Sequence, residues 1–218
     1  MRPRGIVLYG PPASGKSTIT AALADTDPQF TLLRKLKVGT GRTDEYDFVT
    51  AEHLEQLREA GRLLVETRRY GNTYAVDACT VEAMAEADQI PIVHVGSVAD
   101  LHQLTDSGGD WLRVRLWVPR ELCEQRSQSR GDTDTDKRLQ AWDEAQTDLN
   151  VHAETATFDL SISTQDAEAV VVAREIAGAF AALAAEGEGA GRSVIGCDRA
   201  GCWSTAVGRG QSGAIRSR

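Results

Sequence analysis

The chain has 218 residues, of which 41% are hydrophobic and 26% are charged, and its formal net charge is −8. These values are typical of a globular protein with one domain, or with one domain and an appendage. The acidic balance argues against nucleic acid as a partner. The apolar runs are too short for a membrane helix or a signal peptide, so we expect a cytoplasmic protein without a membrane partner, present as a monomer or homodimer.

The four cysteines show no CxxC pair and no repeated spacing. They are Cys79, Cys123, Cys197 and Cys202. We therefore expect them to be reduced thiols in a reducing compartment.

A glycine-rich loop follows the first predicted strand, an apolar run at residues 6–9, and precedes a predicted helix at 17–24. Residues 10–17 read GPPASGKS, which fits the pattern G-x-x-x-x-G-K-[ST]. Glycines let the backbone wrap around a phosphate with its N–H groups pointing inward, and the N-terminus of the helix adds positive charge. The pattern therefore predicts a site for a nucleoside triphosphate, which we expect to be ATP with Mg²⁺.

The chemistry of bound phosphates assigns roles to two side chains of this loop. We expect Lys16 to contact the β- and γ-phosphates and to act in catalysis, and the Ser17 hydroxyl to be a Mg²⁺ ligand. The alternative is a glycine turn with a chance lysine. The expected nucleotide-binding residues are Gly10, Pro11, Pro12, Ala13, Ser14, Gly15, Lys16, Ser17 and Thr18.

The pattern changes between residues 31 and 77. Short strands are predicted around residues 46–49, 62–67 and 74–76, and a helix over 51–60 with Thr50 as its N-cap and Gly61 as its stop. We expect this segment to be an insertion that projects from the core.

Strands and helices then alternate regularly. The predicted helices cover residues 81–87, 98–105, 120–130, 137–152 and 167–185, and the predicted strands cover 90–95, 111–118 and 158–162. Such alternation predicts a parallel sheet covered by helices on both faces, a three-layer α/β/α domain over residues 1–185. Residues 186–218 are rich in Gly, Ser, Ala and Arg, and we expect this tail to be mostly disordered.

Residues 34–77 resemble the acceptor-binding part of the guanylate kinase family. The resemblance rests on the basic pair Arg34 and Lys37, the sequence EYDFV at 45–49 and the sequence GNTY at 71–74. It implies a P-loop NTPase fold. It also implies that Arg34, Lys37, Tyr46 and Tyr74 hold the phosphate of an acceptor, and such groups form charge-assisted hydrogen bonds to a dianion. The alternatives are a solvated basic face and packing roles for the tyrosines. Arg42 is an extra positive residue that we expect to be exposed.

Residues 126–138 resemble the lid of the same family. Arg126, Arg130 and Arg138 occupy the positions of the lid arginines, although the GDTDTD segment between them is shorter than usual. The resemblance implies that these arginines stabilise the transferring phosphoryl group when the lid closes. Arg126 and Arg130 are four residues apart and could instead form a solvated helix face.

The residues that read guanine in this family are mostly absent. Their places fall at Phe30, at Val76, at Val65 or Glu66, and at the His94-Val95-Gly96 sequence. Because each lost buried hydrogen bond costs about 1–3 kcal/mol, GMP is disfavoured as the acceptor. The strand around His94 is instead similar to that of ribose 1,5-bisphosphate phosphokinase relatives, which implies a sugar phosphate.

Two residues of this region have open roles. His94 is expected either to contact the acceptor or to be a core histidine. Glu66 is expected to bind an acceptor hydroxyl or organise the metal, or else to be an ordinary surface carboxylate.

The predicted function is ATP-dependent transfer of a phosphoryl group to a small phosphorylated acceptor. A phosphate acceptor is already ionised, so it needs no general base, whereas a hydroxyl acceptor would need an Asp or Glu. The alternatives are a guanylate or other nucleoside monophosphate kinase, a non-catalytic binding module, and a nucleotide-dependent switch or hydroxyl kinase.

Overall fold

The structure is a computed structural model that describes residues 3–188 except 42, 70 and 131–134. The expectations for Arg42, for the centre of the lid and for the tail beyond residue 188 therefore lie outside the described residues. None of the described helices is both long and apolar enough to cross a membrane.

A five-stranded parallel sheet forms the centre of the fold, with the strand order β2-β7-β1-β8-β9. The strands are β2 (Phe30–Leu32), β7 (Ile90–Val95), β1 (Arg4–Tyr9), β8 (Asp110–Trp117) and β9 (Leu160–Ser163). The central strand β1 pairs with β7 and β8, so that Ile6 lies opposite Ile92 on one side and Leu112 on the other. Because both faces of β1 are buried, the apolar run at 6–9 is continuous rather than alternating.

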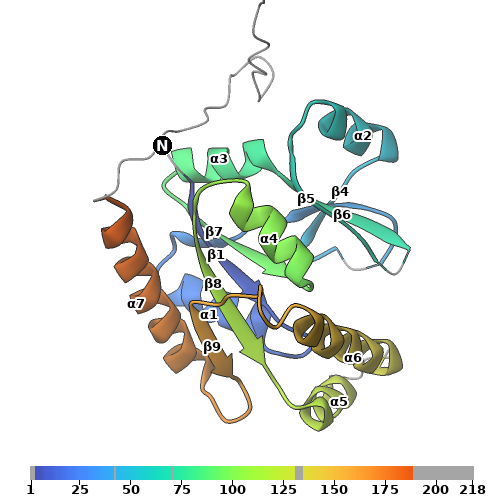
Figure 1. Ribbon diagram of the computed structural model, residues 1–218, viewed down its shortest axis with the longest axis vertical. Coiled ribbons are helices and arrows are strands. Elements are labelled where there is room, and N and C mark those ends of the chain that lie inside the picture. The colour runs from blue at the N-terminus through green and yellow to red at the C-terminus, as the bar shows by residue number, and fades with distance from the viewer. Residues whose placement is uncertain (1–2, 42, 70, 131–134, 189–218) are drawn as a thin grey trace, which may run out of the picture.

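Helices cover both faces of this sheet, which confirms the predicted three-layer fold (Figure 1). Helices α1 (Lys16–Thr26) and α7 (Ala169–Glu188) pack together on one face, over a core that includes Ile6 and Leu8. Helices α3 (Ala78–Glu86) and α4 (Val98–Asp106) lie on the other, over a core that includes Val7 and Tyr9.

A smaller four-stranded sheet stands beside the central one, with the order β4-β3-β6-β5 (Figure 1). Its elements are β3 (Lys35–Val38), β4 (Tyr46–Phe48), helix α2 (Ala51–Glu59), β5 (Leu63–Arg69) and β6 (Asn72–Asp77). As predicted, Thr50 caps α2 by accepting a hydrogen bond from the His53 amide, and Gly61 follows the helix with a positive φ of 66°.

Two further helices, α5 (Arg120–Ser129) and α6 (Thr135–Val151), pack together on the other side of the phosphate-binding loop. Cys123 of α5 and Leu139 of α6 form a small core with Ala13 and Val118. The Trp142 indole donates a hydrogen bond to the Val118 carbonyl at 2.8 Å. These contacts place α6 at the edge of the loop at residues 10–17, so that its one arginine, Arg138, lies near this loop.

The structure corrects two details of the sequence reading. Strands β2 and β3 were not predicted, and β2 belongs to the central sheet, so the insertion expected at 31–77 begins a few residues later. The expectation of reduced thiols holds for Cys123, which is free and buried, and is wrong for Cys79, which is disulfide-bonded. The other two cysteines lie outside the described residues.

Candidate active site

The loop between β1 and α1 has the backbone shape that its glycines permit. A Cβ atom on Gly10 would lie 2.3 Å from the Leu116 carbonyl oxygen, so only glycine fits there. Gly15 has a φ of 90° and forms the N-cap of α1, a left-handed conformation that favours glycine. Ala13 also has a positive φ, of 59°. The loop therefore wraps over the N-terminus of α1, where anions are stabilised.

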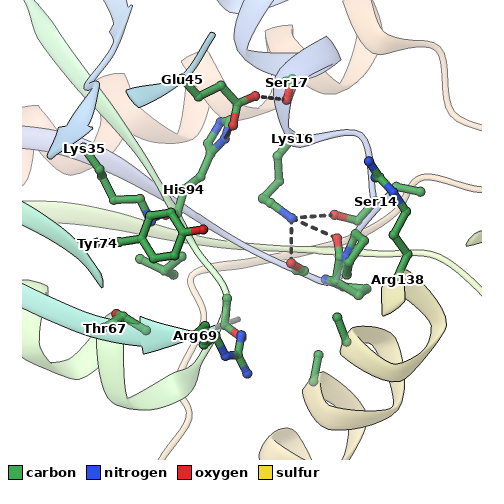
Figure 2. Close-up of a pocket in the computed structure, with 18 of the residues that line it drawn as sticks. Ser14, Lys16, Ser17, Lys35, Glu45, Thr67, Arg69, Tyr74, His94 and Arg138 are labelled. Atoms are coloured by element: carbon green, nitrogen blue, oxygen red, sulfur yellow. Dashed lines mark hydrogen bonds and ion pairs between the residues drawn. The ribbon is translucent and has the colours of Figure 1, made fainter. Parts of the chain in front are cut away.

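Lys16 lies inside this loop (Figure 2). Its Nζ donates hydrogen bonds to the Gly10 carbonyl at 2.6 Å and the Pro11 carbonyl at 2.9 Å, and lies 3.4 Å from the Ser14 hydroxyl. Burial lowers the pKa of Lys16 to about 8, and the nearby Glu45 carboxylate opposes the shift. The ammonium is thus held by weak neutral acceptors, which a phosphate oxygen can replace with a charged partner.

Ser17, at the start of α1, faces a carboxylate from the small sheet. Its hydroxyl donates to Oε1 of Glu45 at 2.5 Å, and Oε2 of Glu45 lies 3.7 Å from Nδ1 of His94. His94 is buried at the end of β7, and its Nε2 lies 2.8 Å from the Thr20 hydroxyl. Burial lowers the pKa of His94, so the imidazole is neutral at neutral pH.

A cavity of about 880 Å³ opens between the loop and the small sheet. Figure 2 shows Lys16 and Arg138 on one side, with Lys35, Thr67, Arg69 and Tyr74 on the other. The lining residues of the small sheet and its surroundings are Lys35, Lys37, Thr40, Gly41, Glu45, Tyr46, Thr67, Arg69, Asn72, Tyr74, His94 and Asp100. Positive side chains therefore occupy both ends of one cavity.

Lys37, Tyr46 and Tyr74 come together in the cavity, as the sequence predicted. The rings of Tyr46 and Tyr74 have centroids 5.1 Å apart. The Lys37 ammonium lies 5.0 Å from the Tyr46 centroid, 5.6 Å from that of Tyr74 and 5.0 Å from that of Phe48. Only 3% of Lys37 is exposed, so an anion would meet a largely desolvated charge. The tyrosines thus pack on the lysine and line the cavity at the same time.

Three further residues of the acceptor side were missed by the sequence reading. Lys35 reaches over to donate to the His94 carbonyl at 2.8 Å, and burial lowers its pKa. Arg69 donates to the Gly96 carbonyl at 3.1 Å. The Thr67 hydroxyl donates to Asp100, a buried carboxylate in the first turn of α4, at 2.6 Å. The signal was present in the sequence, because Lys35 and Lys37 alternate with Leu36 and so share one strand face.

Two predicted acceptor residues point elsewhere. Arg34 donates to the Asp47 carboxylate at 2.7 Å and to the carbonyls of residues 43, 44 and 46, so it holds this loop in place outside the cavity. Glu66 accepts two hydrogen bonds of 2.8 Å from Arg58 of α2. For Glu66 the reason is the alternation of side chains along β5. Thr67 and Arg69 face the cavity, so Glu66, next to Thr67, lies on the opposite face of the strand.

The three lid arginines have different positions. Arg138, on α6, and Arg130, at the end of α5, line the main cavity. Arg126 donates to the Ala13 carbonyl at 3.0 Å and to the Thr164 carbonyl at 2.6 Å, which fastens the outside of the phosphate loop. It lines a second cavity of about 280 Å³ together with residues that include Gly15, Thr18, Arg130 and Thr164. The structure therefore brings two of the three arginines to the expected place.

A family model matches most of this chain. Residues 2–176 match the family model of guanylate kinase. A guanylate kinase of Ralstonia nicotianae is 30% identical over 86 residues, which make up 37% of this chain and 39% of that protein. The matched stretch thus spans about two fifths of this relative's length.

A solved guanylate kinase structure shows the same fold at low sequence identity. The crystal structure of guanylate kinase from Anaplasma phagocytophilum has a TM-score of 0.59 at 15% identity, with 83% of this chain and 86% of that chain covered. A shikimate kinase from Acinetobacter baumannii has a TM-score of 0.41 at 15% identity, covering 83% of this chain and 93% of that chain. A gluconokinase from Sinorhizobium meliloti has a TM-score of 0.42 at 17% identity, covering 85% and 96%.

Proposed function

The chain belongs to the guanylate kinase family, and on that premise we propose that it transfers the γ-phosphoryl group of ATP to a small phosphorylated acceptor other than GMP. One observation supports this most strongly. The same cavity holds Lys16 and Arg138 at one end and Lys35, Lys37 and Arg69 at the other, in a chain whose net charge is −8. Two opposed groups of cations suit two phosphate-bearing molecules that meet between them.

The donor end suits a nucleoside triphosphate. The phosphates would take the loop N–H groups and the Lys16 ammonium, and the second cavity beside Gly15 and Thr18 would take part of the nucleoside. The hydroxyl of Ser17 and the carboxylate of Glu45 are oxygen donors, which Mg²⁺ prefers. We therefore assign the Mg²⁺ site to Ser17 and the phosphate oxygens. When bound, the ion supplies neutralisation of negative charge on the β- and γ-phosphates.

The acceptor end suits a phosphate group. Lys37 and the hydroxyls of Tyr46 and Tyr74 would bind its oxygens, and Lys35 would add charge from the same face of β3. The acceptor oxygen is ionised at neutral pH, so these residues need only place it in line with the donor. Arg138 would stabilise the charge on the group in transfer.

The rest of the acceptor end suits hydroxyl groups rather than guanine. At the expected base-reading positions, Val65 and Val76 are buried in the core, and Glu66 is bound to Arg58. The cavity instead presents the Thr67 hydroxyl and the Asp100 carboxylate, with the Asn72 side chain near Gly39. This supports a sugar phosphate or a similar hydroxylated phosphate ester.

ADP release measured with a panel of phosphorylated acceptors tests the proposal. The panel holds sugar phosphates, GMP and the other nucleoside monophosphates, each with the wild-type chain and with Lys16→Ala. We expect the highest kcat/KM with a sugar phosphate and loss of turnover in Lys16→Ala. The family match also fits a second candidate, guanylate kinase itself. GMP as the best acceptor would favour that candidate and contradict the proposed acceptor.

A further inference from the structure

The strand ends beside the phosphate loop lack the acidic residue that a P-loop enzyme uses at its Mg²⁺ site. In P-loop NTPases the ion is held by the loop Ser or Thr and by an Asp at the end of a neighbouring strand. Here β7, which pairs with β1, ends in His94 and Val95 and is followed by Gly96. Strand β8, on the other side of β1, is followed by Val118 and Pro119. Neither strand end provides a carboxylate.

A carboxylate does reach Ser17, but it comes from the small sheet. Glu45 precedes β4, 28 residues from Ser17 in the chain, and its Oε1 accepts the Ser17 hydroxyl at 2.5 Å. Its Oε2 lies 3.7 Å from His94, the residue at the usual acidic position. The side chain is 22% exposed, so it is partly shielded from water. Figure 2 shows the Glu45 carboxylate beside Ser17, with the His94 ring next to it.

The loop that carries Glu45 is held firmly. The guanidinium of Arg34 binds the carbonyls of Thr43, Asp44 and Tyr46 at 3.0, 2.7 and 2.6 Å, and binds the Asp47 carboxylate at 2.7 Å. These bonds are made on both sides of residue 45 in the sequence. The position of the Glu45 carboxylate is therefore fixed by the hydrogen bonds that Arg34 makes to its neighbours, and not by its contact with Ser17 alone.

We propose that Glu45 supplies the carboxylate of the Mg²⁺ site in place of a residue on β7. The hydroxyl of Ser17 can offer a lone pair to the ion while it still donates its hydrogen to Glu45, because a hydroxyl is one donor and two acceptors. A carboxylate that accepts from a metal ligand makes this ligand a better electron donor and fixes its orientation. His94, which bonds to the Thr20 hydroxyl through Nε2, helps to position the Glu45 carboxylate through Nδ1.

This assignment links the two halves of the cavity. Glu45 lies in the turn just before β4, beside the sheet that carries Lys37 and Tyr46, whereas Ser17 lies at the start of α1, next to the nucleotide loop. Metal and nucleotide bound at Ser17 would therefore stabilise the position of the acceptor-binding sheet. By linkage, a bound acceptor would raise the metal affinity by the same factor.

The inference rests on the proposed nucleotide site, and its test uses no acceptor. Mn²⁺ is titrated, with detection of free Mn²⁺ by electron paramagnetic resonance, into the full chain saturated with ADP. The variants are Glu45→Gln and, as a matched control, Glu59→Gln, which removes one negative charge from an exposed position on α2 of the same insertion. We expect Glu45→Gln to weaken Mn²⁺ binding by about 10- to 100-fold, and Glu59→Gln to leave it unchanged. ADP affinity measured in EDTA should be equal in all three proteins.

Two results would overturn the assignment. One is unchanged Mn²⁺ affinity in Glu45→Gln, including the case where this variant loses phosphoryl transfer, because the carboxylate would then act on the acceptor. The other is an equal loss of ADP affinity without metal, which would show that the loop itself has been disturbed. A wrong acceptor class would change neither titration, so the two proposals fail separately.

Discussion

Lys35 and Lys37 lie two positions apart on the same face of β3, and both line the acceptor end of the cavity. Lys37 lies among aromatic rings, while Lys35 bonds to the carbonyl of His94 on the central sheet. Lys37 is buried within the small sheet, whereas Lys35 is partly buried where this sheet meets the central one. This pair, rather than Arg34 and Lys37, would give the proposed acceptor site its charge.

Replacing either lysine with methionine should weaken acceptor binding without affecting the donor. Methionine keeps most of the aliphatic stem and removes the charge. We expect the KM for the acceptor to rise about 10- to 100-fold, the loss of a roughly 1.5–3 kcal/mol hydrogen bond to a charged group, while the KM for ATP stays constant. Steady-state kinetics with each substrate varied in turn measures this. Arg68→Ala, an exposed position on β5, is the control. An equal rise in both KM values would argue against the assignment.

Substitutions of the two lid arginines Arg138 and Arg126 should have different effects. Arg138 lines the main cavity, so Arg138→Lys should lower kcat by roughly a thousandfold and change the Kd of ATP little. Arg126 bonds to backbone carbonyls of Ala13 and Thr164, so Arg126→Lys should instead lower Tm and weaken ATP binding. Single-turnover kinetics and thermal melts distinguish the two. A larger loss of kcat in Arg126→Lys than in Arg138→Lys would reverse these roles.

Nucleotide binding should take up protons near pH 8. The pKa of Lys16 is lowered to about 8 by burial, and a bound phosphate would raise it by stabilising the charged form. At pH 8 the free lysine is about half protonated, so ADP binding without metal should take up about half a proton at this site. The uptake should vanish well below pH 8, where Lys16 is already charged. Calorimetry in two buffers of different ionisation enthalpy measures it, with Lys16→Met as the control. The same uptake in Lys16→Met would assign it to another group.

Glu66 should matter for stability and not for catalysis. Hydrogen bonds from Arg58 lower the pKa of the Glu66 carboxyl. The ionised Glu66 therefore stabilises the folded state at pH values above the pKa of a glutamate in the unfolded chain. This stabilisation is lost as the pH falls through the lower pKa that Glu66 has in the folded state. Glu66→Gln should show a small decrease in Tm at neutral pH that disappears in acid. Its kcat/KM should stay within about twofold of wild type. A large loss of acceptor binding would restore the role that the sequence suggested.

The sequence was most informative where the candidate site is formed by consecutive residues. It was less informative where the site depends on which face of a strand a side chain occupies. The loop at residues 10–17 could be predicted as a tight connection between a strand and a helix, because its glycines determine the backbone locally. On the short strands of the insertion, a shift of one residue moves a side chain to the other face. Arg34 and Glu66 were therefore assigned to the cavity, whereas Lys35 and Arg69 were missed. Glu45 could not be found by spacing, because its partner is in another part of the fold.

The most direct test of the two-phosphate cavity is to follow the label from [γ-³²P]ATP in a metabolite extract. Wild-type protein and Lys37→Met are incubated with the extract, and labelled products are identified by mass spectrometry. We predict that the wild type places the label on a small molecule that already carried a phosphate, and that Lys37→Met forms the same product much more slowly. Label found only in inorganic phosphate, or on a molecule that carried no phosphate, would contradict the account.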